Sequence, residues 1–418
     1  MNKRVVITGV GVITPIGIGK KDFWDSLASG RSGIRKITRF DVSSYPSQTA
    51  GEVDNFDPTD YMDPKTARRM DRFSQFAVAS AKIALEDAQF EINDKNCREI
   101  GIVIGSAIGG LPLAEDQHSI FLEKGLRRIS PYLAICLFTG AASSQISIAL
   151  GIKGFSNTLG GACATGTDVI GHAFHNIRHG ISRIIFAGAA EAPLSPFTYG
   201  AFSVMNVLST LNGDPRKSSK PFDRERNGFV LSEGAAVLIL EELNHALDRG
   251  AHIYAEILGY GTTFDSFNMA QPSPDGIEGA NAVKFALKDA EIRPEEIDYI
   301  NAHGSATPLN DRTETKIIKE VFGEHAYTIP VSSNKSMTGH PLGAAGAIEA
   351  AASILTLEHQ FLPPTINLQN PDPECDLDYI PNVGREAEVN IVLSSSYGFG
   401  GKNSAILLKR FNGNGGPT

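Results

Sequence analysis

Two stretches of the chain, roughly two hundred residues apart, follow the same pattern. Residues 82–107 read KIALEDAQFEINDKNCREIGIVIGSA, and residues 284–306 read KFALKDAEIRPEEIDYINAHGSA. Each has a helix-like segment with the letters AL and DA, an acidic connector, and an apolar strand that leads into GSA. A looser pair, residues 183–192 and 391–401, adds a strand that ends in small residues to each copy. Because there are only two copies, the repeat predicts a duplicated unit and not a solenoid.

The alternation of strand-like and helix-like segments predicts an α/β layered fold. Within it we expect two similar halves, residues 1–250 and residues 251–418, packed against each other. The segment KRVVITGVG near the N-terminus predicts a buried strand that the glycines end, and residues 67–90 predict one long amphipathic helix. The last residues, 411–418, have no core-forming pattern and are expected to be loosely attached.

Charge and hydropathy exclude several classes of function. The formal net charge of −9 at pH 7 argues against nucleic-acid binding, which needs a basic surface. No run of about 18 apolar residues is present, so we expect no membrane partner, and the N-terminal residues do not resemble a signal peptide. Cys97, Cys136, Cys163 and Cys375 form no CxxC pair, which favours reduced thiols and a cytoplasmic location over disulfides or a zinc site.

Two further motifs have simpler explanations than function. The glycine-rich residues 9–19 lack the GxGxxG spacing and place Pro15 where a helix would begin, so a dinucleotide site is not expected. His172, His175 and His179 have helical spacing and could share a metal ion, but no Glu or Cys joins them in a known ligand motif. A solvated helix end is the favoured interpretation, and we expect neither a metal nor an organic cofactor.

The segment GGACATG, residues 160–166, surrounds Cys163 with residues that have almost no side chain. The residues that follow have one apolar face and predict a helix that begins at or just after Cys163. Free N–H groups and the positive end of the helix dipole would then favour a nucleophilic thiolate. From this segment alone, a small buried cysteine in a tight turn is an equally good interpretation.

Two histidines in the second half follow the same logic. YINAHGSATP places His303 directly after a buried strand, and NKSMTGHPLGAAGAIEAA places His340 in a loop between Lys335 and a helix that carries Glu349. A neutral imidazole can donate a hydrogen bond to a developing oxyanion, and a Lys–Glu pair could orient the rings. Two such loops together with a cysteine favour a catalytic site over packing.

A third loop, SYGFGGKN, has two glycines directly after Phe399. Glycines let the backbone approach a ligand closely, so we expect Gly400 to contact the substrate. The N–H groups of Phe399 and Cys163 could together form an oxyanion hole.

The motifs GACATG, NAHGSATP, NKSMTGHPLGAAGAIE and GFGG, in this order, resemble those of the β-ketoacyl-[acyl-carrier-protein] synthases of the type II elongating class. The resemblance runs almost from end to end of the chain. It implies a thiolase-like, five-layered α-β-α-β-α sandwich made of two duplicated halves. The first half would carry the nucleophilic Cys, and the second would carry both catalytic His and the GFGG loop.

The resemblance also implies a role for each motif residue. Cys163 would carry the acyl chain as a thioester, and His303 and His340 would stabilise the enolate formed when a malonyl group loses carbon dioxide. The implied supporting and oxyanion-hole residues are Lys335, Glu349 and Phe399. The implied substrate contacts are Ile108 and Phe202 along an acyl channel, Ser305 and Thr307 along the pantetheine arm, and Gly400.

The partners implied by the resemblance are an acyl carrier protein and a second subunit. The basic residues Lys65, Arg68 and Arg69 have helical spacing and could dock an acidic carrier protein, although a solvated helix face explains them equally well. A homodimer is expected through residues 154–161, with a heterodimer with a chain-length-factor-like homologue as an alternative.

Four positions depart from the usual pattern of the family. Asn268 and Ala270 stand where relatives often carry His and Thr, Asn206 where an Arg is common, and Lys402 where Thr or Asn usually follows GFGG. These changes leave the acyl substrate and the carrier protein open.

Three alternative functions follow from the same residues. The chain could be a specialised type II polyketide or polyene ketosynthase that works with a chain-length partner. It could be a thiolase-like acyl-CoA acyltransferase, but the second cysteine that thiolases need near the C-terminal loops is not matched by Cys375 in its polar loop. A silent partner subunit is disfavoured because Cys163 is retained.

Overall fold

The strands of the two halves follow the same order outward from a shared centre. The computed structural model describes residues 2–413, and its large sheet has 11 strands. In the first half the order is β1 (Val5–Thr14), β8 (Gly234–Glu242), β7 (Ile184–Glu191), β5 (Ile100–Gly105) and β6 (Ser156–Leu159). In the second half it is β9 (Ala255–Phe264), β15 (Lys402–Arg410), β14 (Ile391–Gly398), β10 (Tyr299–Asn301) and β11 (Val331–Ser332). The antiparallel pairing of β1 with β9 joins the halves.

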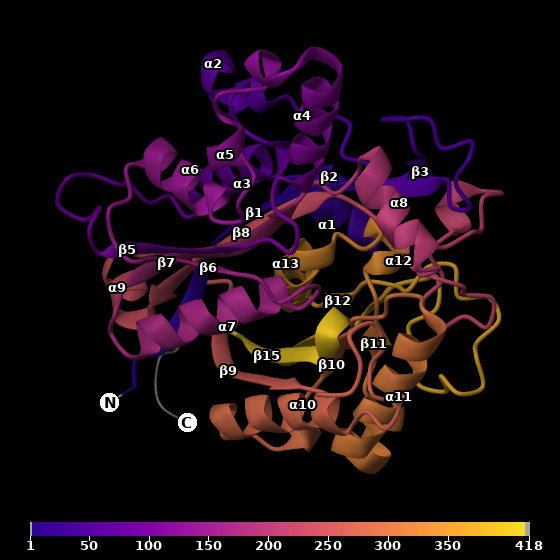
Figure 1. Cartoon of the computed structure of the whole chain (residues 1–418). Helices are drawn as coiled ribbons and strands as arrows, with labels where there is room; N and C mark the ends of the chain where they lie inside the picture. The colour runs from indigo at the N-terminus through magenta and orange to yellow at the C-terminus, as the bar shows by residue number, and fades with distance from the viewer. Residues whose placement is uncertain (1, 414–418) are drawn as a thin grey trace.

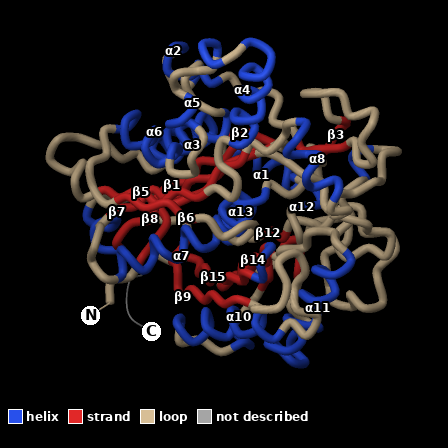
Figure 2. Tube along the Cα trace, viewed as in Figure 1, coloured by secondary structure: helices blue, strands red, loops and turns tan. Residues whose placement is uncertain are grey.

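Helices cover both groups of strands and fill the space between them (Figures 1 and 2). The outer helices of the first half are α3 (Arg72–Asp87) and α6 (Ala141–Leu150). The outer helices of the second half are α10 (Ile277–Ala290) and α11 (Pro308–Phe322). Between the two groups of strands lie α7 (Thr165–Arg178) and α13 (Ala345–His359). The predicted five-layered α-β-α-β-α sandwich is confirmed.

The remaining elements connect these layers or project from them. The short strands are β2 (Gly17–Ile18), β3 (Ile34–Lys36), β4 (Thr49–Gly51), β12 (Phe361–Leu362) and β13 (Arg385–Glu386). The remaining α-helices are α1 (Lys20–Ala28), α2 (Pro64–Ala67), α4 (Leu111–Lys124), α5 (Leu133–Cys136), α8 (Pro196–Val204), α9 (Leu243–Asp248) and α12 (Lys335–Thr338). The 3₁₀ turns are η1 (Pro58–Asp60), η2 (Leu126–Arg128), η3 (Pro215–Lys217), η4 (Pro294–Glu296), η5 (Gly323–Tyr327), η6 (Leu342–Ala344) and η7 (Phe399–Gly401).

The sequence repeat corresponds to equivalent elements of the two halves. In each half an outer helix, α3 or α10, precedes the strand that GSA follows, β5 or β10. The looser pair corresponds to β7 and β14, which are the direct neighbours of β5 and β10. The duplication inferred from the sequence is therefore confirmed.

The prediction that glycines end the first strand is wrong. β1 continues through Gly9 and Gly11 to Thr14. A methyl group at either glycine would overlap the backbone of α3, at Ala84 and Ser80 respectively. These glycines therefore allow a helix to pack closely on the strand and do not break it.

The predicted single helix over residues 67–90 is divided in two. α2 ends at Ala67, and α3 begins at Arg72 after a turn. The side chain of Asp71 accepts a hydrogen bond from the Phe73 N–H (3.0 Å), as an N-cap does. The apolar periodicity continues across this break, so the sequence pattern did not indicate that a new helix begins at Arg72.

Glycines also bring the two central helices together at their N-terminal ends. A methyl group at Gly166 of α7 would overlap the backbone of Ala347 in α13, and one at Gly346 of α13 would overlap Thr167. Because the positive ends of both helices point to one region, anionic species are stabilised there. This region contains the loops that carry the motifs.

Within residues 2–413, none of the helices is long and apolar enough to cross a membrane. Residues 411–413 follow β15 at the C-terminal end, and the rest of the tail expected to be loose lies outside the described residues.

Candidate active site

A cavity of about 350 Å³ brings together the motifs from both halves. Cys163 reaches it from the start of α7, His303 from the end of β10, His340 from the loop after α12, and Phe399 from the end of β14. The other lining residues are Met205, Asn206, Val207, Asn227, Gly228, Phe229, Ala270, Gln271, Pro272, Ser305, Thr307, Pro308, Leu309, Asn310, Tyr397 and Gly398. No Lys, Arg, Asp or Glu is found among these described lining residues.

Cys163 stands at a sharp turn just before α7, as the sequence predicted. The preceding residue, Ala162, has a φ of 48°, which is unusual for a residue with a side chain. The helix begins two residues after the cysteine, at Thr165. Gly398 packs against this turn, because a methyl group there would lie 3.0 Å from the Cys163 nitrogen.

The expectation that Cys163 is a thiolate is wrong for the closed cavity. Burial raises the pKa of the Cys163 thiol to about 12, while the Lys335 charge and the N–H of Phe399 oppose this rise. The helix terminus does not outweigh the loss of water around the sulfur. The resting cysteine is a protonated thiol that must lose its proton to react.

The two histidines are neutral and lie side by side in edge-to-face contact at the cavity. Their ring centroids are 5.2 Å apart at an interplanar angle of 87°. Burial lowers the pKa of both His303 and His340 well below the usual value, and the nearby Lys335 charge lowers it further. The neutral imidazoles inferred from the sequence are therefore supported by their surroundings.

Lys335 orients His303 through two contacts. Its Nζ lies 3.3 Å from Nδ1 of His303 and donates to the His303 carbonyl (2.6 Å). An ammonium group can only donate, so Nδ1 accepts and the ring hydrogen resides on Nε2. Lys335 also pairs with the carboxylate of Glu349 in α13, and both side chains are 2% exposed. The Lys335–Glu349 pair predicted from the sequence is therefore present.

A second carboxylate fixes the backbone of the His303 loop. Glu314 of α11 accepts hydrogen bonds from the N–H groups of His303 and Gly304, each at 2.7 Å. The His340 loop is held differently, because its N–H donates to the carbonyl of Val230 (2.7 Å). The backbone at His303 is thus fixed by a neighbouring helix, and the backbone at His340 is fixed by the first half of the molecule.

The predicted substrate contacts divide into two groups. Ser305 and Thr307 line the cavity, with their hydroxyl oxygens 3.1 Å apart. Ile108 and Phe202 do not line it but pack against the apolar cluster that contains Cys163. Gly400 is exposed and is not among the lining residues. The substrate contact expected of Gly400 is therefore not supported, and Gly398, at the base of the same turn, lines the cavity instead.

Two groups of sequence candidates lie elsewhere. Lys65, Arg68 and Arg69 are exposed at α2, which projects from the outer layer and contributes nothing to the cavity. Cys375 is buried in the apolar cluster of the second half, away from the cavity.

The three histidines of α7 lie at its C-terminal end. The rings of His175 and His179 stack at 5.8 Å. The described residues contain no cluster of three or more His, Cys, Asp and Glu side chains that could hold a metal ion.

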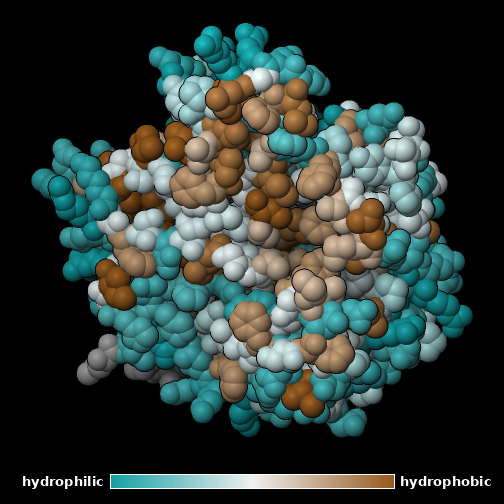
Figure 3. Space-filling view, viewed as in Figure 1, coloured by the Kyte–Doolittle hydropathy of each residue, from teal (hydrophilic) through white to brown (hydrophobic). Residues whose placement is uncertain are grey.

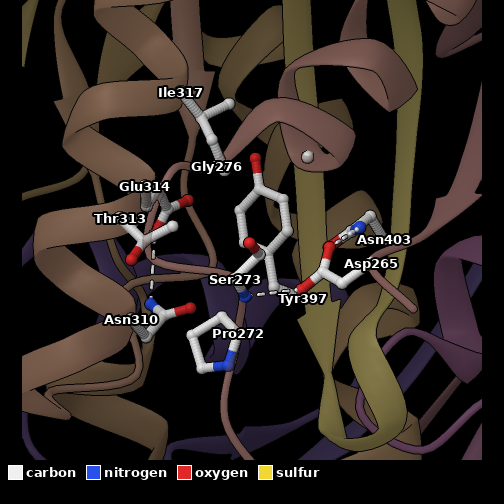
Figure 4. Close-up of a pocket in the computed structure, with 11 residues that line it drawn as sticks. Asp265, Pro272, Ser273, Gly276, Asn310, Thr313, Glu314, Ile317, Tyr397 and Asn403 are labelled. Atoms are coloured by element: carbon white, nitrogen blue, oxygen red, sulfur yellow. Dashed lines mark hydrogen bonds between the residues drawn. The ribbon is translucent and has the colours of Figure 1, made fainter. Parts of the chain in front are cut away.

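The sequence analysis missed two aromatic residues of the site. Phe229 packs edge-on against His340 (5.1 Å between centroids), and Tyr397 lies 6.0 Å from His303. Tyr397 separates the cavity from a smaller pocket, shown in Figure 4, in which Glu314 and Asp265 also lie. Tyr397 directly precedes GFGG, so its position was a usable signal, whereas Phe229 has no motif near it.

A buried cysteine at the end of a central helix, facing two neutral histidines from the other half of a duplicated sandwich, defines a thiolase-like condensing enzyme. Residues 2–246 match the family described as "Beta-ketoacyl synthase, N-terminal domain", and residues 254–369 match its C-terminal domain. The chain belongs to the β-ketoacyl synthase family.

Curated relatives match nearly the whole chain. A protein of Synechocystis sp. named 3-oxoacyl-[acyl-carrier-protein] synthase 2 is 48% identical over 409 residues, covering 98% of each chain. The Coxiella burnetii protein of the same name is 47% identical and covers 98% of this chain and 99% of the relative.

Solved structures agree with this assignment. A type II polyketide ketosynthase in complex with its acyl-carrier protein has a TM-score of 0.90 at 37% identity, covering 98% of this chain and all of that one. A β-ketoacyl synthase from Burkholderia phymatum has a TM-score of 0.91 at 35% identity, with the same coverage.

Proposed function

We propose that this β-ketoacyl synthase elongates carrier-bound acyl chains by decarboxylative condensation, with Cys163 as the acylated nucleophile. First, Cys163 Sγ attacks the thioester of an acyl carrier protein, and the pantetheine thiol leaves with the proton that Cys163 gives up. A malonyl thioester then loses carbon dioxide. The resulting enolate attacks the Cys163-bound acyl carbon, the C–C bond forms, and the C–S bond to Cys163 breaks. Cys163 leaves as a thiolate and takes up one proton from water, which restores the resting thiol.

One observation carries this proposal: Cys163, His303, His340 and Phe399 converge on one cavity from opposite halves of the molecule. The Nε2–H of His303 is free to donate to the enolate oxygen, and a second neutral imidazole at His340 adds another possible donor. A protonated histidine would assist decarboxylation less well. It would also stabilise the malonyl carboxylate, and so oppose the loss of carbon dioxide. The lowered pKa values of both rings fit this requirement.

The test is intact-protein mass spectrometry after incubation with a series of acyl carrier proteins. We expect one acyl adduct on the wild-type protein, none on Cys163→Ala, and an unchanged adduct on Cys375→Ala. Addition of malonyl carrier protein should discharge the adduct and yield a carrier-bound product that is two carbons longer. An adduct that survives Cys163→Ala, or turnover of acyl-CoA but of no carrier-bound substrate, would overturn the proposal.

The same experiment decides between the two pathways that the comparisons suggest. The 46–48% identical relatives are named 3-oxoacyl-[acyl-carrier-protein] synthase 2, whereas one structural neighbour at 37% identity is a polyketide ketosynthase bound to a hexaketide. Acceptance of saturated chains would favour fatty-acid elongation. Acceptance of poly-β-keto or polyene chains alone would favour the specialised alternative.

We further propose that two copies pair through β6. This strand is at the end of the sheet and pairs with β5 on one side. The N–H of Thr158 donates to the side chain of the adjacent Asn157 (2.8 Å), as on a free edge. Such an edge is an available site for strand pairing.

Apolar side chains gather over the upper and central part of the face shown in Figure 3, where α4, α5 and α8 lie in Figure 1. The exposed apolar residues of α4, η2, α5 and α8 are Leu111, Phe121, Leu122, Leu126, Ile135, Phe197 and Val204. A surface of this kind is typical of a subunit interface. A homologous second chain would fit the same surface, and one structural neighbour of this type is the ishigamide ketosynthase/chain length factor, at 36% identity and a TM-score of 0.92.

A further inference from the structure

The turn that carries Phe399 cannot hold its own position. Gly400 and Gly401 both have positive φ, 81° and 76°, and Gly400 has no heavy atom near the place of a side chain. A turn made of such residues has many accessible conformations. Yet Phe399 lines the cavity together with Cys163 and packs against the apolar cluster that contains it. Its N–H opposes the rise in the pKa of the thiol, so it would stabilise negative charge that forms at Cys163. Contacts at the base of the turn must therefore define where this N–H points.

One of these contacts is an ion pair between the base of the turn and α7. Lys402 pairs with Gly398 across the β14–β15 ladder and so closes the turn. Its Nζ lies 3.2 Å from Oδ2 of Asp168 and donates to Oγ1 of Thr262 (2.5 Å). The two charged side chains are 12% and 9% exposed.

Asp168 belongs to the first turns of the helix that carries the nucleophile. Its other oxygen accepts hydrogen bonds from the Tyr260 hydroxyl (2.7 Å) and from Ser404. It also lies beside the Cys163 turn, since a methyl group at Gly161 would lie 2.9 Å from Oδ2 of Asp168. These contacts hold the Asp168 carboxylate in place, so it has little freedom to move with Lys402.

The other side of the turn is attached to a different segment. The N–H of Gly400 donates to the Met269 carbonyl (2.9 Å), and Asn403 donates to Asp265 (2.7 Å), as Figure 4 shows for the latter pair. This segment, residues 265–269, leads away from β9 and has no part in α7. The ion pair instead connects the base of the Phe399 turn to α7, beside hydrogen bonds from Ser404 to Asp168 and between Ser396 and Thr167 (2.8 Å).

We propose that Asp168 and Lys402 form a positioning pair that holds the Phe399 N–H at Cys163. The inference rests on the proposed function, because it concerns the transfer of the acyl group to Cys163. Neither residue lines the cavity, so neither touches the substrate there. The threonine or asparagine that the resemblance implies after GFGG would be too short to reach Asp168 in the same way, so the pair gives a role to Lys402.

The test measures the rate constant for acylation of Cys163 by a saturating acyl carrier protein. We expect Lys402→Gln and Asp168→Asn each to lower it by about tenfold to a hundredfold, the effect of displacing one oxyanion donor, with KM changed by less than about twofold. Lys402→Arg, which keeps the charge, and the exchange Asp168→Lys with Lys402→Asp should each recover part of the rate.

The control is the ion pair of Arg178 and Asp289, which attaches the opposite end of α7 to α10 at 2.7 Å, with side chains 19% and 22% exposed. Arg178→Gln should lower the melting temperature as much as Lys402→Gln does but leave the acylation rate within about twofold. Hydrogen exchange gives a second readout: peptides covering residues 396–403 should exchange faster in Lys402→Gln and unchanged in Arg178→Gln.

Equal losses of rate in the two pairs would reduce Asp168 and Lys402 to a structural role and overturn the inference. An undiminished acylation rate in Lys402→Gln would also overturn it. If the wild-type protein itself takes up no acyl group, the proposed function fails instead, so the two failures are distinguishable.

Discussion

At the scale of single residues, the site is governed by the removal of water. Cys163 is 5% exposed, and His303 and His340 are each 2% exposed. Burial disfavours the charged form of every one of these groups, so it raises the pKa of the thiol and lowers the pKa of the imidazoles. The site thus holds three neutral groups around one buried cation, Lys335, which Glu349 balances.

The first prediction concerns the reactivity of Cys163. Because the pKa of its thiol is about 12, the thiolate fraction should grow tenfold with each pH unit throughout the neutral range. The rate of carbamidomethylation of Cys163 by iodoacetamide, followed by peptide mass spectrometry, should therefore show no plateau up to about pH 9. A plateau between about pH 7 and 8 would show instead that the helix terminus dominates.

The second prediction concerns stability at acidic pH. His340 has a lowered pKa in the folded state, so the unfolded state binds its proton first and stability is lost as pH falls below the unfolded value of about 6.5. Between about pH 7.5 and 5.5 the free energy of unfolding should fall by about 1.4 kcal/mol because of this histidine. Denaturant unfolding of His340→Gln should show a correspondingly smaller acid-induced loss than the wild-type protein. Equal losses in both proteins would contradict the neutral assignment.

At the scale of elements, the site depends on how closely α7 and α13 approach. Each helix presents a glycine to the other, Gly166 and Gly346, and neither site has room for a methyl group. Cys163 lies in the turn just before the N-terminal end of α7, and α13 carries Glu349, the partner of Lys335. The distance between these helices therefore determines the distance between the nucleophile and the groups that orient His303.

The third prediction tests this packing. Gly166→Ala should lower the free energy of unfolding by about 1–3 kcal/mol, since the methyl group would overlap the Ala347 backbone and the helices would have to separate. Acylation of Cys163 should also slow. Gly213→Ala is the control, because a methyl group there meets no atom within 4 Å, and it should leave both quantities nearly unchanged. Denaturant titration measures the first effect, and an unchanged midpoint for Gly166→Ala would contradict the argument.

At the scale of the whole molecule, the reactive cavity and the charged surface are separate. The described lining residues of the cavity include no charged side chain, whereas Lys65, Arg68 and Arg69 are exposed on α2 of the outer layer. Arg69 also lies over the ring of Tyr132, at 4.8 Å. Arg127 and Arg128 of η2 are exposed as well. The resemblance implies that a carrier protein docks on these basic residues, which would separate docking from the chemistry.

The fourth prediction follows from this separation. Arg68→Glu should raise KM for carrier-bound substrate by about tenfold, weaken the salt dependence of KM, and leave kcat nearly unchanged. Turnover of a small thioester without a carrier should not change. Lys288→Glu, an equally exposed position on α10, is the matched control, and an equal effect there would show that net charge alone matters.

The fifth prediction concerns the second subunit. Successive N–H groups of a strand point to opposite edges, and in β6 the N–H of Ser156 points away from β5. Ser156→Pro removes this N–H from the free edge and should therefore convert a dimer into monomers. Ser156→Ala keeps this N–H and should remain dimeric. Sedimentation velocity measures both variants, and a monomeric wild-type protein would contradict the proposed pairing.

Much of the site could be predicted because its residues occur in short motifs next to predicted strands and helices. Cys163, His303, His340 and Phe399 reach one cavity, and the pair of Lys335 with Glu349 is present. Phe229 could not be predicted, because it contacts His340 from a segment that is distant in the sequence and has no motif. Gly400 was predicted to line the site in place of Gly398, because the local sequence does not indicate which glycine of a turn lies at its base.

The amino-acid sequence by itself determined the duplication, the order of strands and helices, and the identity of the reactive groups, because these depend on local periodicity and on residue type. The tertiary structure decided the protonation of Cys163, the separation of α2 from α3, and the pairing of Asp168 with Lys402. Each of these depends on what surrounds a group in space: how much water burial removes, which side chain reaches a free N–H, and which charge from a distant segment comes within a few ångströms.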